Sequence, residues 1–199
     1  MTTREKAKKS SFQKPILGKA EVERRTKLHE KFIEQIKSIS DTAIQMVVFK
    51  LGNEKFSIEI SKIGKVVETP KISHLPNTPP YIPGIINIDG RGIIVLDLAH
   101  KLKLVNHSEN DQQQGLYTVI VNSQRFTIGI LVSEVPENVI VQGNQIQPTG
   151  LDLAGTPQDE TYIKGLIQTK KGPLFFIDID ELIDGDRMEA KALNEETTP

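Results

Sequence analysis

Histidines are the residues of this chain best suited to proton transfer or metal binding, yet their spacing matches no known site. The four are His29, His74, His100 and His107, and none belongs to a pattern such as H-E-x-x-H. His100 and His107 flank a loop near Asp97, which would suit a weak metal site, although solvated loop histidines are the simpler interpretation. The chain has no cysteine, which excludes thiolate nucleophiles, thiolate metal ligands and disulfides.

An acidic cluster near the end of the chain is the other candidate for chemistry. It consists of Asp178, Asp180, Glu181 and Asp184, and it lacks the glycine and the ligand spacing of a calcium loop. Asp178 and the earlier Asp97 each follow a strand-like run and precede a short apolar turn, which favours a role as helix caps. The sequence also lacks a G-x-S-x-G elbow and a phosphate-binding loop. We therefore expect no catalytic residues, no metal and no cofactor.

Charge is distributed unevenly along the 199 residues. The net charge is only −1, which argues against a dedicated nucleic-acid-binding protein. Residues 1–40 hold eight lysines, three arginines and five glutamates, a net charge of +6, so residues 41–199 carry −7. No apolar run approaches the ~18 residues of a membrane helix, and the lysine-rich start lacks the apolar region of a secretory signal. A basic extension therefore precedes an acidic body, in a chain that suits a reducing cytoplasm.

The first 43 residues divide into a tail and a helix. Residues 1–19 lack periodicity and are predicted to form a disordered basic tail. Over 20–43 the pattern predicts an amphipathic helical extension, because Leu28, Phe32 and Ile36 recur at helical spacing. A lone amphipathic helix is marginal in water, so we expect it to pack against the body. The alternative is a free arm that binds a partner or an anionic membrane surface.

Beyond residue 44 the patterns of short β-strands come in pairs. Ile and Val dominate the runs, and Gly, Pro, Asn and Asp bound them. The strongest turn is Asp89-Gly90, because this dipeptide adopts the positive φ angles of a tight hairpin. The four predicted hairpins are Met46–Leu51 with Lys55–Ile60, Ile82–Ile88 with Ile93–Leu98, Leu116–Val121 with Arg125–Val132, and Ile163–Thr169 with Leu174–Ile179. The pattern predicts an all-β body.

This body contains an internal repeat. Tyr81–Gly84 matches Tyr162–Gly165, and each tyrosine is followed 16 residues later by an aspartate, at an offset of 81 residues between the copies. Phe56–Ile58 matches Phe126–Ile128 at an offset of 70, and the difference of 11 falls in a loop expected at 143–160, where insertions cost little. Each copy is too small to bury much surface alone. Two small barrels packed side by side are the simplest architecture.

Together these segments resemble the CheW family, the coupling proteins of bacterial chemotaxis. The resemblance spans roughly residues 45–184 and rests on the order and spacing of several motifs. The motifs are Phe49–Ile60, Leu75–Gly90, Asp97-Leu98, Gly129–Val132, Ile146–Pro148 and Tyr162–Gly165. It implies that residues 44–185 form two interlocked, five-stranded, Src-homology-3-like barrels, preceded by the N-terminal helix. Residues 186–199 would be a second disordered tail.

The resemblance also implies a function without catalysis. Members of the family are adaptors that couple the cytoplasmic tips of methyl-accepting chemoreceptors to the regulatory domain of a CheA-type histidine kinase. The chain would then be cytoplasmic and recruited to membrane-associated receptor arrays, without inserting into the membrane or binding nucleic acid. The alternative is a double-barrel protein that binds a peptide or small ligand in another pathway, such as twitching motility or phototaxis.

A partner-binding site on the first barrel is a further implication of the resemblance. Its residues would be Ile63, Lys65, Gly84, Asn87, Asp89 and Arg91. The family usually has a glutamate at the position of Lys65 and an arginine at that of Asp89, so both signs are reversed here. A retained ion pair would leave this pattern, but so would independent drift or the turn preference of Asp89-Gly90. Ile63 and Gly84 have second interpretations, as a core residue and as a bend between strands.

Overall fold

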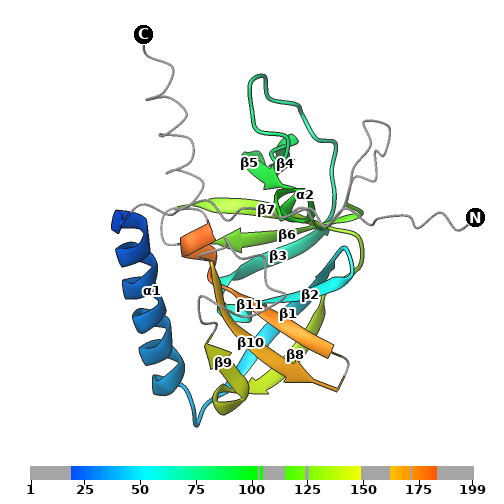
Figure 1. Ribbon diagram of the computed structural model, residues 1–199. Helices are drawn as coiled ribbons and strands as arrows, with labels where there is room; N and C mark the ends of the chain where they lie inside the picture. The colour runs from blue at the N-terminus through cyan, green and yellow to red at the C-terminus, as the bar shows by residue number, and fades with distance from the viewer. Residues whose placement is uncertain are drawn as a thin grey trace, which may run out of the picture.

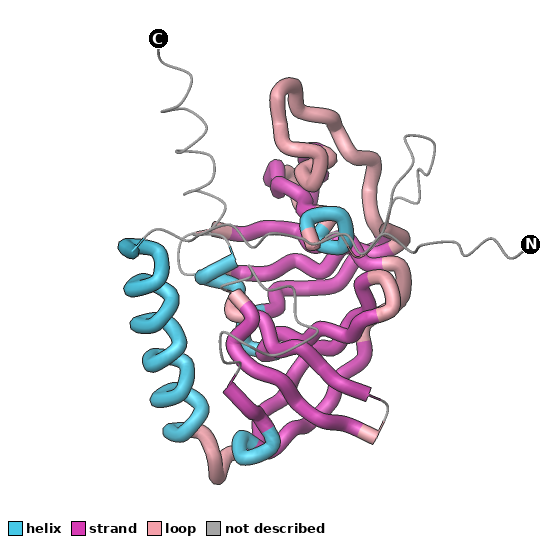
Figure 2. The backbone as a smooth tube through the Cα atoms, in the orientation of Figure 1, coloured by secondary structure: helices cyan, strands magenta, loops and turns pink. Residues whose placement is uncertain are grey.

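One long helix precedes a body of short β-strands, as the sequence predicts, although the helix ends at Ser38 and residue 43, the last of the predicted extension, begins the first strand (Figures 1 and 2). The computed structural model describes residues 19–102, 104, 115–123, 126–148, 162–170 and 172–182. The helices are α1 (Lys19–Ser38), α2 (Leu98–Lys101) and the 3-10 helices η1 (Ile60–Lys62) and η2 (Gly143–Gln145). The strands are β1 (Ala43–Leu51), β2 (Glu54–Glu59), β3 (Ile63–Glu68), β4 (Gly84–Ile88), β5 (Arg91–Leu96), β6 (Tyr117–Asn122), β7 (Thr127–Val132), β8 (Glu137–Gln142), β9 (Ile146–Pro148), β10 (Ile163–Thr169) and β11 (Gly172–Ile177). The predicted tails at 1–19 and 186–199 lie outside the described residues, except for Lys19, which begins α1.

All four predicted hairpins are present, as β1/β2, β4/β5, β6/β7 and β10/β11. Three strands, β3, β8 and β9, do not belong to any of the hairpins predicted from the sequence. The loop expected over 143–160 is wrong at its start, because η2 and β9 occupy residues 143–148. β9 is too short to show an alternating pattern. In β3 a bulge between Ile63 and Lys65 breaks the alternation of inward and outward side chains.

Two sheets form, and each is completed by a hairpin from the other half of the chain. Barrel 1 has the strand order β3-β6-β7-β5-β4, and barrel 2 the order β8-β1-β2-β11-β10-β9. β2 pairs in parallel with β11, and β7 pairs in parallel with β5. β8 and β9 are one strand interrupted by η2, which pairs with β1 on one side and β10 on the other. Barrel 2 therefore has five strands in six segments, and the prediction of two interlocked barrels is confirmed.

The internal repeat is confirmed where its two copies end. The Asp97 N–H donates to the Tyr81 carbonyl oxygen at 2.8 Å, and the Asp178 N–H donates to that of Tyr162 at 2.7 Å. Each aspartate then opens a helical turn, α2 in the first copy and residues 179–182 in the second. The offset of 81 residues therefore matches equivalent atoms in equivalent contacts.

The earlier match, at an offset of 70, is displaced by two residues. Phe175 and Ile94 are 81 apart, and the strand register places Phe56 opposite Phe175 and Ile128 opposite Ile94. Phe56 is thus equivalent to Ile128, at an offset of 72. In agreement, Phe56 is fully buried, whereas Phe126 is 37% exposed. A shift of two residues keeps every side chain on the same face of a strand, so an alternating pattern alone does not reveal it.

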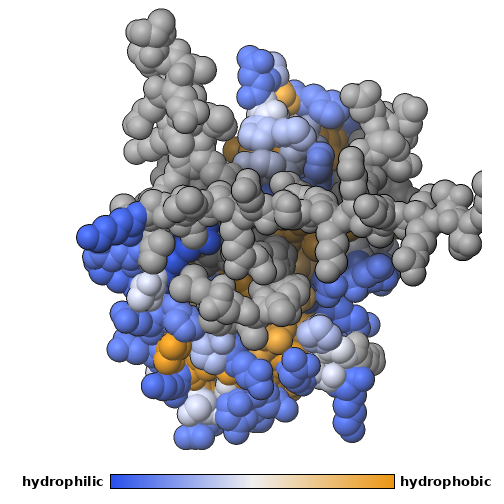
Figure 3. Space-filling model, in the orientation of Figure 1, coloured by the Kyte–Doolittle hydropathy of each residue, from blue (hydrophilic) through white to orange (hydrophobic). Residues whose placement is uncertain are grey.

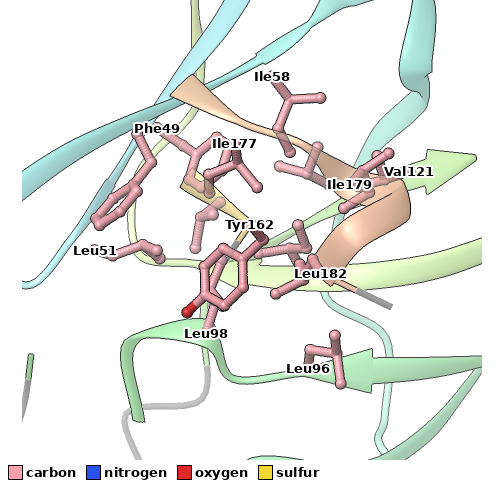
Figure 4. Close-up of a cluster of buried hydrophobic side chains, with 14 of the residues drawn as sticks. Phe49, Leu51, Ile58, Leu96, Leu98, Val121, Tyr162, Ile177, Ile179 and Leu182 are labelled. Atoms are coloured by element: carbon pink, nitrogen blue, oxygen red, sulfur yellow. The ribbon is translucent and has the colours of Figure 1, made fainter. Parts of the chain in front are cut away.

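The largest hydrophobic cluster lies where the two barrels meet. It includes Phe49 and Ile177 of barrel 2 together with Leu96 and Val121 of barrel 1, and Figure 4 shows its side chains coming from both barrels. Tyr162, at the start of the second repeat motif, belongs to the same cluster and is 3% exposed. Each barrel also has a smaller cluster of its own, but this largest one needs side chains from both barrels.

Helix α1 packs along barrel 2 beside β9 and β10 (Figure 1). Phe32 and Ile36 are 3% and 5% exposed, and Ile36 belongs to the core of barrel 2. The chain after the helix is held as well, because the Asn144 N–H donates to the Ser40 carbonyl oxygen at 2.9 Å. The visible outer side of α1 is mostly hydrophilic (Figure 3). Since each buried side chain of this kind contributes about 1.5–3 kcal/mol, the apolar face accounts for most of the docking free energy.

We predict that Phe32→Ala loosens α1 without unfolding the barrels. Truncating a buried phenylalanine costs about 3–5 kcal/mol, which is enough to speed hydrogen exchange of the α1 amides more than tenfold. Hydrogen exchange with mass spectrometry measures this rate, and Lys27→Ala on the exposed face of the helix is the control. Exchange of residues 28–39 in the unmodified chain at the rate of an unstructured peptide would contradict the docked helix.

Candidate partner-binding site

The residues assigned to partner binding gather at the seam of barrel 1, where its two edge strands approach each other. β3 and β4 are those edges. Lys65 lies near the start of β3, whereas Asn87, Asp89 and Arg91 lie around the turn that joins β4 to β5. All four side chains are exposed. Ile63 is half-buried and packs against the cluster between the barrels, so it supports the strand from inside.

The tip of the hairpin is a tight two-residue turn, as Asp89-Gly90 predicts. Ile88 pairs with Arg91 across it, and the φ angles of Asp89 and Gly90 are +52° and +80°. Both angles are positive, as the turn types that suit a right-handed β-hairpin require. The Asn87 Oδ1 accepts a hydrogen bond from the Gly90 N–H at 2.9 Å. This contact fixes the tip and holds Asp89 at its apex.

Lys65 and Asp89 form an ion pair across the seam, in which the Lys65 Nζ donates to the Asp89 Oδ2. Their side chains are 41% and 81% exposed, so a partner can reach both charges. The seam is also closed at Ser73, whose N–H donates to the Ile85 carbonyl oxygen at 2.8 Å and whose carbonyl oxygen accepts from the Ile85 N–H at 2.9 Å. The ion pair between Lys65 and Asp89 is the arrangement that a retained pair with exchanged charges would have, and the origin of the two charges stays open.

The β-bulge in β3 shapes the same region. Ile63 lies opposite Val121 and Lys65 lies opposite Ile120, so Gly64 is the additional residue of the bulge. A Cβ at Gly64 would lie 3.0 Å from the Asn122 Nδ2, which leaves little room for a larger side chain. Bulges bend and twist a strand locally. Here the bulge precedes the lysine that pairs with the hairpin tip.

Gly84 is buried, whereas the charged and polar members of the site are exposed. Its φ angle is +148°, and a Cβ there would lie 2.2 Å from the Ser73 carbonyl oxygen. The repeat glycine of barrel 2, Gly165, has a similar position, because its Cβ would lie 2.7 Å from the Ile146 Cγ2. In both barrels the absence of a side chain at this glycine lets a neighbouring segment come close to its strand: the segment of Ser73 in barrel 1 and that of Ile146 in barrel 2. The close approach of Ser73 and the positive φ angle support the structural interpretation of Gly84, as a bend between strands.

Two exposed apolar side chains on the same strands were not predicted as part of the site. Val66 follows Lys65 on β3 and is 39% exposed, and Ile94 on β5 is 43% exposed. The unbroken apolar run of β5 after Gly92 is the sequence signal that could have indicated Ile94, because one side of an edge hairpin faces solvent. Because successive side chains of a strand point to opposite faces, Val66 and Lys65 lie on different faces of β3, and the two apolar side chains are separate from the charged pair.

The carboxylates of the two caps serve the structure. The Asp97 Oδ1 accepts from the His100 N–H at 2.9 Å, and the Asp178 Oδ1 accepts from the Asp180 N–H at 3.0 Å, so the prediction of helix caps is confirmed.

Metal binding and membrane insertion are the remaining questions from the sequence. Among the described residues, no group of three or more acidic or histidine side chains could hold a metal ion. His107 and Asp184 lie outside those residues. No helix within the described ranges is long and apolar enough to cross a membrane.

Comparison with known proteins gives one consistent family. The model of the CheW-like domain matches residues 45–187, which span both barrels and leave α1 outside. The chemotaxis protein CheW of Klebsiella aerogenes is 27% identical over 146 residues, covering 72% of this chain and 84% of that protein. The one of Treponema pallidum is 25% identical over 158 residues, covering 78% and 91%. The crystal structure of the scaffolding protein TtCheW from Thermoanaerobacter tengcongensis is similar with a TM-score of 0.60 and 26% identity, covering 69% of this chain and 86% of that one.

We predict that Gly84→Ala destabilises the fold, because the added methyl group meets backbone. The strained φ angle and the collision should together lower the free energy of unfolding by about 2–4 kcal/mol. The control is Gly90→Asn at the hairpin tip, where nothing lies within 4 Å of a Cβ and asparagine tolerates positive φ. Urea denaturation measures both variants. A Gly84→Ala variant of unchanged stability would contradict the close approach of Ser73 to this glycine.

We also predict that Lys65 and Asp89 are coupled energetically. In a double-mutant cycle with Lys65→Met and Asp89→Asn, the coupling should be about 0.2–1 kcal/mol, as for exposed pairs. It should shrink in 1 M salt, because the Debye length falls to about 3 Å. Asparagine keeps the turn, so the cycle isolates the charge. The more distant pair Lys50–Glu134, at 3.8 Å, is the control and should couple less. Strictly additive effects would show that the two residues do not interact.

Proposed function

We propose that this chain, which belongs to the CheW-like family, is a non-catalytic adaptor that couples chemoreceptors to a CheA-type histidine kinase. The family match across both barrels supports this proposal most strongly. The relatives named above are chemotaxis proteins, and the solved relative is a scaffolding protein. The proposed partners of this chain are the regulatory domain of the kinase and the cytoplasmic tip of a methyl-accepting receptor, in an array at the membrane.

The architecture suits an adaptor. The two interlocked barrels share their largest hydrophobic cluster, so a partner held on one barrel keeps a constant position relative to a partner on the other. An edge strand offers backbone hydrogen-bonding groups to a partner, and the seam of barrel 1 adds exposed apolar and charged side chains. The tight turn at Asp89 limits the motion of the tip. A rigid contact surface reduces the entropy lost on binding.

We assign the receptor contact to the seam around Lys65 and Asp89. The positive charge on β3 and the negative charge at the hairpin tip are the reverse of the usual family arrangement. A reversed pattern attracts a partner with the complementary charges and repels partners that fit the ordinary arrangement. The ion pair between the two side chains shows that both charges occupy one surface patch. The proposed receptor of this chain therefore differs in charge from the receptors of ordinary relatives.

The proposal predicts saturable 1:1 binding of the full chain to the regulatory domain of a kinase encoded beside it. Isothermal titration calorimetry measures this affinity, and the same method measures binding to the matching receptor tip. Lys65→Glu and Asp89→Arg should each weaken receptor binding roughly fivefold or more through charge repulsion. Their combined effect should be smaller than the sum, because the double variant restores a pair of the usual polarity.

Further measurements test receptor binding and kinase binding separately. Lys27→Glu changes a charge on the exposed face of α1 and should leave receptor binding unchanged. The double variant should bind the receptor of an ordinary relative more tightly than the unmodified chain does. Absence of binding to any co-encoded kinase would overturn the adaptor proposal and favour a double-barrel protein that binds a peptide or small ligand elsewhere.

A further inference from the structure

The strand that carries the candidate site is linked to α1 by two lysine–carboxylate pairs. The Lys31 Nζ of α1 lies 3.1 Å from the Glu181 Oε1, and the Lys62 Nζ of η1 lies 3.0 Å from the Asp180 Oδ2. Glu181 and Asp180 are neighbours in the helical turn 179–182. Because η1 leads directly into β3, the two pairs form a continuous connection between the N-terminal helix and the seam of barrel 1.

These charges surround one pocket of about 380 Å³ between α1, η1 and the end of β11. Lys164 is at its wall with a side chain only 11% exposed, and its Nζ lies 3.8 Å from the Asp178 Oδ2. The same Nζ lies 5.7 Å from the ring centroid of Phe32 and 5.4 Å from that of Phe176. A buried charge is costly unless it is paired. Lys164 and Asp178 therefore hold each other in place, and Phe32 from α1 covers them.

The turn between the two pairs is held rigidly. The Asp178 Oδ1 accepts hydrogen bonds from the Asp180 N–H at 3.0 Å and from the Glu181 N–H at 3.2 Å. Ile179 and Leu182 anchor the turn in the central core, with 2% and 0% of their surface exposed. A turn fixed at both its backbone and its apolar side chains transmits a displacement instead of absorbing it.

By contrast, η1 is weakly anchored. None of its residues is buried, and Glu59 makes no side-chain hydrogen bond as its N-cap. The pair between Lys62 and Asp180 therefore adds a side-chain contact to the packing against β1 and the flanking strands β2 and β3 that hold η1. The bulge between Ile63 and Lys65 follows at once. A shift of η1 would therefore move the lysine that pairs with the hairpin tip.

Charge favours the docked arrangement of α1. Burial acts to lower the pKa of Lys31, but the hydrogen bond to Glu181 and the charges of Glu181, Asp178 and Asp180 outweigh it and raise the pKa above its ordinary 10.5. Lys31 is therefore charged at neutral pH and attracted to the turn. The apolar residues Phe32 and Ile36 provide most of the docking free energy, whereas the lysine sets where the helix meets the turn.

We propose that α1 is a positioning element for partner binding: through Lys31–Glu181 and Asp180–Lys62, the docked helix fixes η1 and the start of β3, and thereby tunes the affinity of the seam for its partner. Lys31 and Lys62 are positioning residues in this arrangement, because they reach the partner only through β3. The inference rests on the proposed function, since it takes the seam as the partner contact. An event that displaces α1 would then weaken partner binding from a distance.

The first test needs no partner. In the full chain, Lys31→Met should raise the hydrogen-exchange rate of the amides from Ser61 to Val66 about two- to fivefold, the range expected for loss of one partly exposed pair. Lys31→Arg keeps the charge and should restore the original rate. Lys27→Met is the matched control, because Lys27 pairs with Glu23 at 3.1 Å on the exposed face of the same helix. Faster exchange confined to α1 and residues 179–182 would overturn the proposal.

The second test measures coupling and binding. Lys31→Met and Lys62→Met should have non-additive effects on the exchange of β3, because both interrupt one connection. Each should weaken binding of the receptor tip about two- to fivefold, with the thermal melt of the barrels unchanged. If the unmodified chain binds the receptor and these variants bind equally well, the positioning role is wrong and the adaptor function stands. If the unmodified chain binds no receptor, the adaptor function is wrong, and the exchange measurements alone decide the coupling.

Discussion

Neither barrel closes without a hairpin from the other half of the chain, and the remaining structure depends on this exchange. β2 lies against β11 and β7 lies against β5, both in parallel, so the two halves cross at the centre of the molecule. The shared hydrophobic cluster is a consequence, because the crossing strands bring apolar faces of both barrels together. The exchange of hairpins also restricts the position of the candidate site. Its strand β3 follows β2 of the other barrel after only three residues of η1, so the seam of barrel 1 is positioned by barrel 2.

Much of this architecture could be predicted from short-range patterns in the sequence. The turn at Asp89-Gly90 depends on two adjacent residues with suitable φ angles, and the structure has the expected hairpin there. The match between the Tyr81 and Tyr162 motifs was found at the correct offset because a tyrosine, a glycine and an aspartate recur at fixed spacing. The tyrosine and the aspartate make the same backbone hydrogen bond in both copies. Patterns of this kind are informative because local geometry restricts which residues are tolerated.

Other features could not be predicted because they depend on distant contacts. The first strand pair was aligned two residues away from its true equivalent, since alternation has a period of two and Phe126 resembles Phe56 in type but not in burial. β9 is defined by its pairing with β10, which the sequence of its three residues does not indicate. The acidic residues Asp180 and Glu181 pair with lysines from elements far away in the sequence. Lys62 and Asp180 are 118 residues apart, and no local spacing indicates that they meet.

The crossing of the two halves has a consequence for how such a molecule can be assembled. A chain with only one copy of the repeat would present a hairpin without its parallel neighbour and a barrel without its hairpin. Two such chains would complete each other by reciprocal exchange, and the product would be a symmetric dimer that forms only at sufficient concentration. Joining the copies end to end makes the exchange intramolecular, with an effective concentration in the millimolar range for a short connection. The fused chain also frees its two halves to diverge, so that α1 packs on one barrel while the reversed charge pair occupies the other.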